Sequence, residues 1–459
     1  MFTVPKESEL SAGLIESAIE YNEKERSRYD KLEKYYRGKH DILSRRKPPT
    51  AKNTRVVINH ANYIVDTSTG YLLGNPIEYK SSDDFDITEI DNQYKMQTMS
   101  DLDHEIAKDV SIFGKQYELI YTDENNVKST DIDVRNCVVV YDDTVEHAKL
   151  FAVIYRKSDE KDKDYEDIVV YDEEFEYVGV DTEGSIGVGE QKPHKFGAVP
   201  VIEYRNNSEE MGDFEQVISL IDAYNLLQSD RINDKEQLVE AILVGYNVNL
   251  EKAQMQELLI NRTMFGLPED SKVEYLIKTL DEGQVDILRK TLEDDIHKIA
   301  KVPNMADENF AGNSSGVAIR YKLLAFEQNV KNKERYFEAG LMERFEVYNN
   351  YLVAINKMSF VPRYEIDAVF KRNLPQNILE ISQIVNNLRG VVDDETLIGQ
   401  IPFVDDVAQS IKKAREESSG RYQLESTGFG TDNSISKEVD KEVGASKKTI
   451  MEKLSDLIG

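Results

Sequence analysis

The chain has 459 residues and carries 57 Lys and Arg against 86 Asp and Glu, a formal net charge of −29. Hydrophobic residues make up 40% of the sequence, which is typical of a chain that folds around a core and excludes a largely disordered one. A protein that grips duplex DNA through its phosphates needs a basic surface, so this charge argues against a sequence-reading DNA-binding protein. It remains compatible with a channel in which DNA must slide without sticking.

Three absences narrow the class of protein. No stretch of about eighteen consecutive apolar residues occurs, so we expect no membrane span. The first residues carry no basic segment followed by an apolar one, so we expect no secretory signal and assembly in the cytoplasm. The single cysteine, Cys137, lies in the apolar run 134–140, and we expect a buried structural thiol.

The first seventy-six residues predict two helices separated by a basic stretch. Residues 9–36 place apolar side chains at near-helical spacing. The basic stretch 37–55 follows, broken by a Pro-Pro pair at 48–49. A second helix is predicted over 56–71 and is closed by Gly-Asn-Pro at 74–76. Since the basic stretch has no interleaved aromatic residues, a nucleic-acid contact, a salt-bridged surface between subunits and a loop near DNA all stay open.

From residue 77 to about 205 the hydrophobic period changes, and we predict a mostly antiparallel β region. Its short runs are rich in Val, Ile, Tyr and Phe and are separated by Asp, Asn and Gly turns. The runs are Gln116–Tyr121, Cys137–Tyr141, Leu150–Arg156, Asp167–Tyr171, Glu174–Val180 and Pro200–Tyr204.

The next part of the chain predicts a long helix, a small insert and a second helix. Apolar residues recur at three- and four-residue steps from Gly212 to Ile242. The insert, 244–281, contains two strand-like pieces, Val244–Val248 and Lys272–Ile277. The returning helix over 285–299 stops at Pro303.

A short polar segment, 303–316, then leads into a helix predicted from 317 to about 357, whose one glycine is Gly340. At about 1.5 Å per residue this helix would be roughly 60 Å long, more than a compact domain needs. A strand over 360–370 and a helix over 377–389 follow. The tail from about 404 is predicted to be helical on both sides of a Gly/Ser-rich interruption at 418–436, and no internal repeat is visible.

One segment imitates a catalytic motif. Residues 312–316 match G-x-S-x-G, the nucleophile elbow of α/β-hydrolases, which requires an acid and then a histidine later in the chain. All six histidines precede Ser314, so a triad in that order is excluded. A loop in which Ser314 caps the following helix is the better interpretation. The six are His40, His60, His104, His147, His194 and His297.

Other catalytic patterns are also missing. The Gly-Lys pairs at 38–39 and 114–115 lack both the upstream glycine and the following Ser or Thr of a P-loop, so we expect no ATP hydrolysis. No zinc-type spacing of His or Cys occurs. We therefore predict no catalytic residue, no metal and no cofactor. Carboxylates that could suggest a two-metal nuclease, but more often form a solvated helix face, are Asp281, Glu282, Asp286, Glu293, Asp294 and Asp295.

Short blocks of sequence lie in order between residues 35 and 406: Tyr35–His40, Asn59–Asp66, Gly70–Pro76, Leu220–Asn225, Ser229–Asp230, Gly312–Ala318, Glu395–Leu397, Ile401–Pro402 and Val404–Asp406. As a set, these blocks resemble the portal proteins, or head–tail connectors, of tailed bacteriophages, of the siphophage type that infects Gram-positive hosts. The last fifty residues match this family least.

The resemblance implies an α+β portal fold with an α/β wing, a two-helix stem, a small α/β clip, a long wing helix and a helical C-terminal crown. Its parts, carried onto this chain, are the wing at 1–208 and 317–403, stem helices at 209–243 and 282–302, the clip at 244–281, a tunnel loop at 303–316 and the crown at 404–459.

The resemblance also implies two groups of site residues. Residues of the DNA-channel tunnel loop would be Asn304, Asp307, Glu308, Asn309, Phe310, Asn313, Ser314 and Ser315. Residues of the partner surface of the clip would be Asn249, Glu251, Arg262, Glu269, Asp270 and Lys272. The loop residues are mostly uncharged or acidic, so we expect weak, reversible contact with DNA.

As a portal protein, the chain would form a ring of about twelve subunits, a homododecamer, at the capsid vertex of the virion. Double-stranded DNA would be packaged and ejected through that ring, and assembly would take place in the host cytoplasm. Implied partners are terminase, which would supply the ATP-driven force, the head-completion (adaptor) protein, and the major capsid and scaffolding proteins. Alternatives are a metal-dependent DNA-processing enzyme and another head–tail structural component.

Overall fold

The structure is a computed structural model, and the chain divides into two units, Met1–Asn373 and Leu374–Gly459, which are described one after the other. The residues that it describes are 1–49, 51–82, 85–123, 126–157, 165–182, 185–239, 242–247, 270, 272–276, 282–305, 316–372, 378–399, 401, 404, 407 and 410–414.

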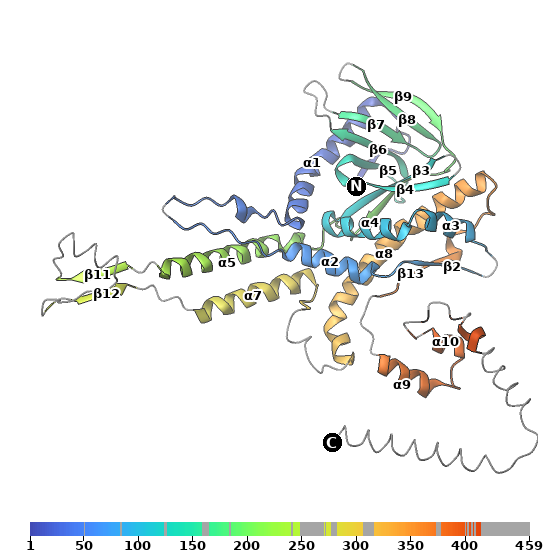
Figure 1. The fold of residues 1–459 in the computed structure, drawn as a ribbon. Helices are drawn as coiled ribbons and strands as arrows, with labels where there is room; N and C mark the ends of the chain where they lie inside the picture. Colours follow the sequence, from blue (N-terminus) through green and yellow to red (C-terminus); the bar gives the residue numbers. More distant parts are fainter. Residues whose placement is uncertain are drawn as a thin grey trace, which may run out of the picture. The chain divides into compact units, whose positions relative to one another are not determined.

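The first unit combines helices and strands in a mixed order (Figure 1). Its helices are α1 (Ala12–Tyr36), η1 (Asp41–Ser44), α2 (His60–Leu73), α3 (Thr88–Met96), α4 (Met99–Phe113), η2 (Val134–Asn136), η3 (Glu215–Val217), α5 (Ile218–Val239), α7 (Glu282–Ala300), α8 (Gly316–Ala354) and η4 (Arg363–Glu365). Its strands are β1 (Phe2–Val4), β2 (Glu78–Ser81), β3 (Lys115–Asp123), β4 (Asn126–Ile132), β5 (Cys137–Asp142), β6 (Lys149–Lys157), β7 (Tyr165–Tyr171), β8 (Phe175–Thr182), β9 (Ser185–Pro193), β10 (Val201–Arg205), β11 (Ile242–Tyr246), β12 (Lys272–Leu276) and β13 (Ile366–Val369).

The helices and strands from β1 to β10 lie within residues 1–205, which we call the N-terminal body. This body contains a six-stranded sheet in the order β1-β5-β6-β7-β8-β9. Strand β1 pairs with β5 in parallel, and the other neighbours are antiparallel. Helix α1 contributes Ile15 and Ile19 to a buried core with Val138, Val140 and Val153 of β5 and β6. Alternate residues of these strands face α1, as the two-residue period of a strand requires.

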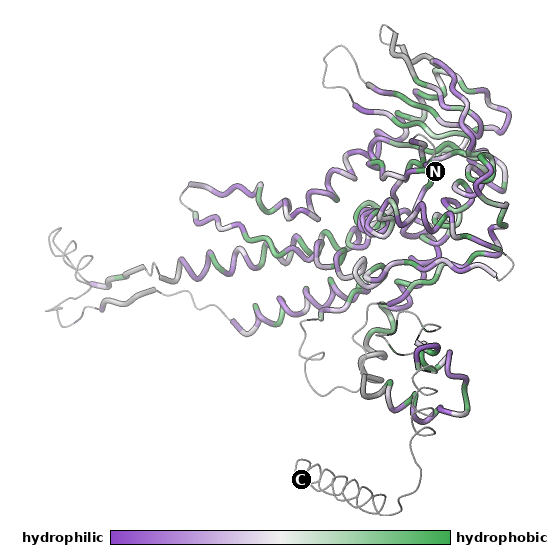
Figure 2. Tube along the Cα trace, turned by 45° about the vertical axis from the view of Figure 1, so that its right-hand side comes forward, coloured by the Kyte–Doolittle hydropathy of each residue, from purple (hydrophilic) through white to green (hydrophobic). Residues whose placement is uncertain are grey.

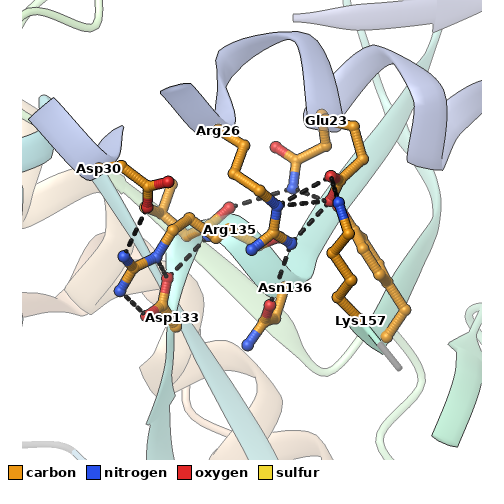
Figure 3. A network of polar contacts seen from close by, with 10 residues as sticks. Glu23, Arg26, Asp30, Asp133, Arg135, Asn136 and Lys157 are labelled. Carbon is orange, nitrogen blue, oxygen red and sulfur yellow. Dashed lines mark hydrogen bonds and ion pairs between the residues drawn. The ribbon is translucent and has the colours of Figure 1, made fainter. Parts of the chain in front are cut away.

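Polar contacts fix α1 on this sheet (Figure 3). Nη1 of Arg135 lies 2.9 Å from a carboxylate oxygen of Asp30 on α1, and its guanidinium also pairs with Asp133. Arg26 of α1 donates from Nη2 to the carbonyl oxygen of Arg135 at 2.8 Å and pairs with Glu23. Because Arg26 and Asp30 lie about one turn apart on α1 and both contact Arg135, they set the position of α1 along the sheet.

A smaller sheet, β10-β3-β4, and the pair β13-β2 bring distant parts of the chain together. Strand β13 pairs antiparallel with β2, with Ile366 opposite Ser81. Helix α8 packs against β10. The segment after residue 316 therefore returns to the N-terminal body, since β13 pairs with β2 and α8 packs against β10.

Helix α8 is anchored in the body by two buried cations. Arg344 is completely buried, with Nη1 2.6 Å from Asp103 and Nε 2.8 Å from Glu118. Lys333 is 2% exposed and lies 2.7 Å from Asp213. Between the two cations, a Cβ atom added to Gly340 would lie 2.5 Å from the ring of Tyr204, so this glycine allows the close approach of α8. The predicted helix 317–357 is thus confirmed.

Most sequence-predicted elements are confirmed, including the strand runs between 116 and 205 and both strands of the insert. The mostly antiparallel β region predicted from residue 77 to about 205 is wrong over 88–113, where two helices that were not predicted, α3 and α4, are found. In α4, Ile106, Val110 and Phe113 are buried at helical spacing, so a helical signal was present there. The strand predicted over 360–370 is also shorter, since only 366–369 pair with β2.

Cys137 is fully buried, as predicted, and burial raises the pKa of its thiol. Figure 2 shows hydrophobic stretches gathered in the body around the sheets, whereas hydrophilic and hydrophobic residues alternate along α5 and α7. Such alternation is typical of helices with one packed and one open face.

The second unit contains α9 (Ile378–Leu388) and α10 (Asp394–Ile398). Helix α9 confirms the helix predicted over 377–389, and Gly390 after it has a φ of +85°, the left-handed conformation common at helix ends. The Asp393 side chain caps α10 by accepting from the backbone N–H of Thr396 at 2.8 Å. Of the predicted crown, only 404, 407 and 410–414 lie within the described residues, and 407 and 410–414 are helical.

Candidate functional site

The most distinctive feature of the first unit is a projection made of α5, α7 and the two-stranded hairpin β11–β12 (Figure 1). Helices α5 and α7 pack side by side. Near the outer end of the pair, Arg231 and Lys235 of α5 lie 3.1 and 3.0 Å from the carboxylate of Glu282 on α7. The strands pair antiparallel, with Ile242 opposite Leu276. The predicted order of helix, small insert and returning helix is confirmed.

The residues that follow α7 are hydrogen-bonded to α2 and to α7. The hydroxyl of Tyr63 on α2 accepts from the backbone N–H of Met305 at 2.8 Å and donates to the carbonyl oxygen of Pro303 at 3.2 Å. The Asn304 amide donates to Glu293 at 2.9 Å. These bonds fix residues 303–305, which we call the loop root, at the point where segment 303–316 begins.

Two buried histidines lie beside the loop root. The rings of His60 on α2 and His297 on α7 meet edge to face with centroids 5.5 Å apart, and each residue is 8% exposed. Nδ1 of His297 lies 3.0 Å from the carbonyl oxygen of Val302. Nε2 of His60 is buried and has no hydrogen-bond partner among the described residues. Burial first, and then the neighbouring His297 and His40, lower the pKa of His60 to about 4, so its ring is neutral near pH 7.

The basic stretch between α1 and α2 lies along α5, and we call residues 37–59 the strap. Alternate residues of its last part are bonded to side chains four residues apart on α5. Two residues of extended chain advance about 6.6 Å and four residues of helix about 6.0 Å, so the two repeats match. The pairs, with the strap backbone N–H as donor, are Thr54 with Asn233 (2.8 Å), Val56 with Ser229 (3.0 Å) and Ile58 with Asn225 (2.8 Å).

Ion pairs strengthen this contact. Nη1 of Arg45 and Nζ of Lys47 both lie 2.9 Å from Oδ1 of Asp230 on α5. Partial burial of Asp230 would raise the pKa of its carboxyl, but the hydrogen bonds from the two cations outweigh it and lower that pKa to about 2. Nδ1 of His40 lies 2.8 Å from the Asn225 amide. Part of the predicted basic stretch is therefore used inside the chain.

The structure covers the predicted site residues unevenly. Of the tunnel-loop residues, Asn304 lies at the loop root, and the others lie outside the described residues: Asp307, Glu308, Asn309, Phe310, Asn313, Ser314 and Ser315. Of the clip residues, Asp270 and Lys272 are described and both are exposed, next to β12 and in it, while Asn249, Glu251, Arg262 and Glu269 lie outside the described residues.

The carboxylates considered for metal chemistry are dispersed. Glu282 pairs with α5, and Asp286 and Glu293 both pair with Arg289 of α7 itself at 3.0 and 2.8 Å. Asp294 is exposed, and Asp281 lies outside the described residues. Within the described ranges, no group of three or more His, Cys, Asp or Glu side chains is placed to hold a metal ion. Nor, in that part of the chain, is any helix long and apolar enough to cross a bilayer.

Two features were not predicted from the sequence. One is the row of polar side chains on α5 that bonds to the strap, which we call the polar ladder, and the other is the role of Tyr63 at the loop root. A usable signal for the ladder exists, because Asn225, Ser229 and Asn233 recur every four residues on one face of a predicted helix. All three are at most 2% exposed, and buried polar side chains require partners. No comparable signal identifies Tyr63, since its partners lie some 240 residues away in the sequence.

Comparisons with known proteins agree on one family. Residues 15–423 match the family described as "Phage portal protein, SPP1 Gp6-like". The chain is 26% identical to the portal protein of Bacillus phage SPP1 over 475 aligned positions, covering 91% of each chain. It is 22% identical to the portal protein of Clostridium phage phiCD119, covering 83% of this chain and 91% of that one.

A solved structure entitled "Neck of empty GTA particle computed with C6 symmetry" is similar over 74% of this chain and 89% of its own, with 10% sequence identity and a TM-score of 0.46. The family match spans the body, the α5–α7 projection and part of the second unit. With its mixed α+β architecture, the chain therefore belongs to the SPP1 Gp6-like family of phage portal proteins, which are structural proteins of the phage virion.

Proposed function

We propose that this portal protein forms a ring of about twelve subunits at the capsid vertex and that double-stranded DNA passes through the ring during packaging and ejection. In this arrangement α5 and α7 are the stem, the β11–β12 insert is the clip, segment 303–316 is the tunnel loop and the sheets with α8 are the wing. The division follows the predicted boundaries 1–208, 209–243, 244–281, 282–302, 303–316, 317–403 and 404–459.

The observation that carries this proposal is the order of parts along the first unit. A projecting pair of antiparallel helices bears a small hairpin at its end, and the second helix leads into a polar segment whose root is held by Tyr63. Such an elongated element has no apparent use in a single globular enzyme. Copies packed side by side would line a passage with it.

Charge supports passage rather than tight binding of DNA. The tunnel-loop segment contains Asp307 and Glu308 and no Lys or Arg, and the whole chain has a net charge of −29. DNA binding through phosphates gains affinity from released counterions at each cationic contact, so an anionic loop would hold the duplex weakly. The force for packaging would then come from terminase, which docks on the ring and is later replaced by the head-completion (adaptor) protein at the clip.

During assembly in the host cytoplasm, the ring would also meet the major capsid and scaffolding proteins. A deletion of residues 306–312 tests the proposal. We expect rings to assemble normally, since the loop root at 303–305 keeps its bonds to Tyr63 and Glu293, while the amount of nuclease-protected DNA in packaging reactions falls.

The control is Val145→Ala, which changes a 99% exposed side chain on the turn between β5 and β6, outside the tunnel-loop segment. It should package DNA as the unchanged protein does. Normal packaging by intact rings of the deletion variant would contradict the tunnel-loop assignment. A monomer or a hexamer of the unchanged protein in native mass measurements would contradict the ring itself.

A further inference from the structure

The strap concentrates positive charge in an otherwise acidic chain. Residues 37–55 contain seven Lys and Arg and one Asp, a local net charge of +6 within a chain of −29. Arg45 and Lys47 are used inside the chain by Asp230. Lys39 and Arg46 are exposed, and Arg37 is exposed while pairing with Glu33 of α1. The strap therefore presents cations to its surroundings.

A surface of different character lies on α7. Its side turned away from α5 carries Ile287 and Leu288, which are 67% and 49% exposed, and the exposed Asp294 about two turns further on. We call this side the α7 edge. Residues 282–300 contain five carboxylates and three Lys or Arg, so α7 is net acidic. Exposed apolar side chains beside carboxylates are suited to a partner surface that carries cations.

Helix α5 lies between these two surfaces, as both views of the chain show (Figures 1 and 2). The strap bonds to positions 225, 229 and 233 of α5, whereas α7 bonds to positions 231 and 235. At 100° per residue, these two sets of positions are centred roughly 140° apart around α5. The strap and α7 therefore form two different, well-separated sides of the projection.

A ring requires two such sides. Neighbours in a cyclic assembly meet through a heterologous contact, in which one surface of a subunit meets a different surface of the next. Because the strap and α7 form two such sides, we propose that the strap of one subunit docks on the α7 edge of a second copy of this chain. This proposal rests on the ring proposed above. The partner is thus another subunit, recognised by cations of the strap facing carboxylates and exposed apolar side chains of α7.

The heights of the two surfaces along the projection agree. Arg45 of the strap pairs with Asp230 of α5, and Glu282 of α7 pairs with the next residue, Arg231. Arg46 and Glu282 therefore lie at similar heights along α5. Rotation about a ring axis that runs along the stem preserves height, so the strap of one subunit would face the first turns of α7 in its neighbour. The carboxylate of Glu282 itself pairs with Arg231 and Lys235 of α5 and lies about 140° around α7 from Ile287. Glu282 therefore marks the height of the contact, and the α7 edge would meet the strap through Ile287 and Leu288.

Cysteine cross-linking tests the contact directly, because Cys137 is the chain's single cysteine and is fully buried. In rings of the Ser44→Cys, Ile287→Cys double variant, a short bismaleimide should produce a ladder of covalent oligomers. Each single variant should stay monomeric on a denaturing gel. A control that pairs Ile287→Cys with Val145→Cys, on the exposed turn between β5 and β6, should give no ladder. Normal rings of the Ser44/Ile287 variant without a ladder would overturn the contact but not the ring.

Charge reversal provides a second test that keeps both surfaces free of cysteine. Arg46→Glu should lower the fraction of protein in rings about three- to tenfold at low salt, and less at high salt, as expected for exposed charge pairs. Lys24→Glu makes the same charge change on an exposed residue of α1, outside the strap, and should have little effect. If both variants assemble alike and only Arg46→Glu rings lose duplex DNA, then the strap serves DNA and the proposal fails. Absence of rings in the unchanged protein would instead contradict the proposed function.

Discussion

We predict that the buried ion-pair cluster around Arg344 contributes strongly to the stability of the packing of α8. Arg344 has no exposed surface, and its partners Asp103 and Glu118 have side chains that are 6% and 0% exposed. The hydroxyl of Tyr204 donates to Glu118 at 2.6 Å, and the Arg344 guanidinium lies 5.6 Å from the centre of the Tyr204 ring. Replacement of Arg344 by Met keeps most of the volume but removes the one cation shared by two buried carboxylates.

The loss of stability expected for Arg344→Met follows from leaving two buried carboxylates without their cation. Breaking a buried ion pair by removing one partner costs about 3–5 kcal/mol, because the remaining charge is left without compensation in the interior. Here two carboxylates remain, and burial already raises the pKa of Asp103 against the opposing effect of Arg344. We therefore expect Arg344→Met to lower the free energy of unfolding by about 3–5 kcal/mol near pH 7.

Urea unfolding at one fixed protein concentration measures this cost, since subunit association stabilises the folded chain by mass action. The matched control is Arg363→Ala, whose side chain and that of its partner Glu346 are each 48% exposed, and which should cost no more than about 1 kcal/mol. A cost for Arg344→Met as small as that of the control would refute the reasoning.

A further variant separates charge from packing in the same cluster. Within the described part of the chain, Nη2 of Arg344 and Oε1 of Glu118 have no hydrogen-bond partner, so the cluster is incompletely satisfied. Replacing all three charged residues together, as Arg344→Met, Asp103→Leu and Glu118→Met, should therefore recover most of the lost stability. No recovery would indicate that shape rather than charge dominates.

Three other perturbations give expected outcomes. Gly340→Ala should destabilise the chain by about 1–3 kcal/mol in urea unfolding, because the added Cβ would lie 2.5 Å from the Tyr204 ring. The control is Gly70→Ala inside α2, where the added Cβ would meet no neighbouring atom within 4 Å, and it should be neutral or stabilising by up to about 1 kcal/mol. The pKa of His60 is 6.5 unfolded and about 4 folded, so the unfolded chain takes up the proton first and stability falls as pH drops from about 6.5 to about 4. That loss is up to about 3 kcal/mol, and His60→Phe should remove this part of the pH dependence of the urea midpoint. Tyr63→Phe should speed amide hydrogen exchange at Met305 about fivefold, equivalent to ~1 kcal/mol, as mass spectrometry would detect; unchanged exchange would show that Tyr63 does not hold the loop root.

Local periodicity predicted most elements of the fold. The three- and four-residue recurrence of apolar side chains in 214–227 and 285–299 reports which face of each helix is buried. The continuous apolar run 137–141 indicates a strand that is buried throughout. The same reasoning failed at α3, where only Ile90 and Tyr94 supply a buried apolar pair among nine residues. A short helix with so few apolar residues carries little periodic signal.

The candidate site was predicted only in outline. The polar composition of 303–316 and its place after a helix identified a loop, but the root that holds it depends on Tyr63 of α2. Likewise, the basic stretch 37–55 was evident from composition. Which of its cations are available to a partner became clear only once Arg45 and Lys47 were found on Asp230.

The sequence by itself determined the order of helix, small insert with two strands, returning helix, polar segment and long helix, because each element is encoded by the spacing of neighbouring residues. Only the tertiary structure decided how these elements are joined. Arg344 meets Glu118 across 226 residues, and Ile58 meets Asn225 across 167. Local periodicity can show that a polar side chain such as Asn225 is buried, but it does not show which distant residue is its partner, since buried polar groups find their partners only when the whole chain has packed.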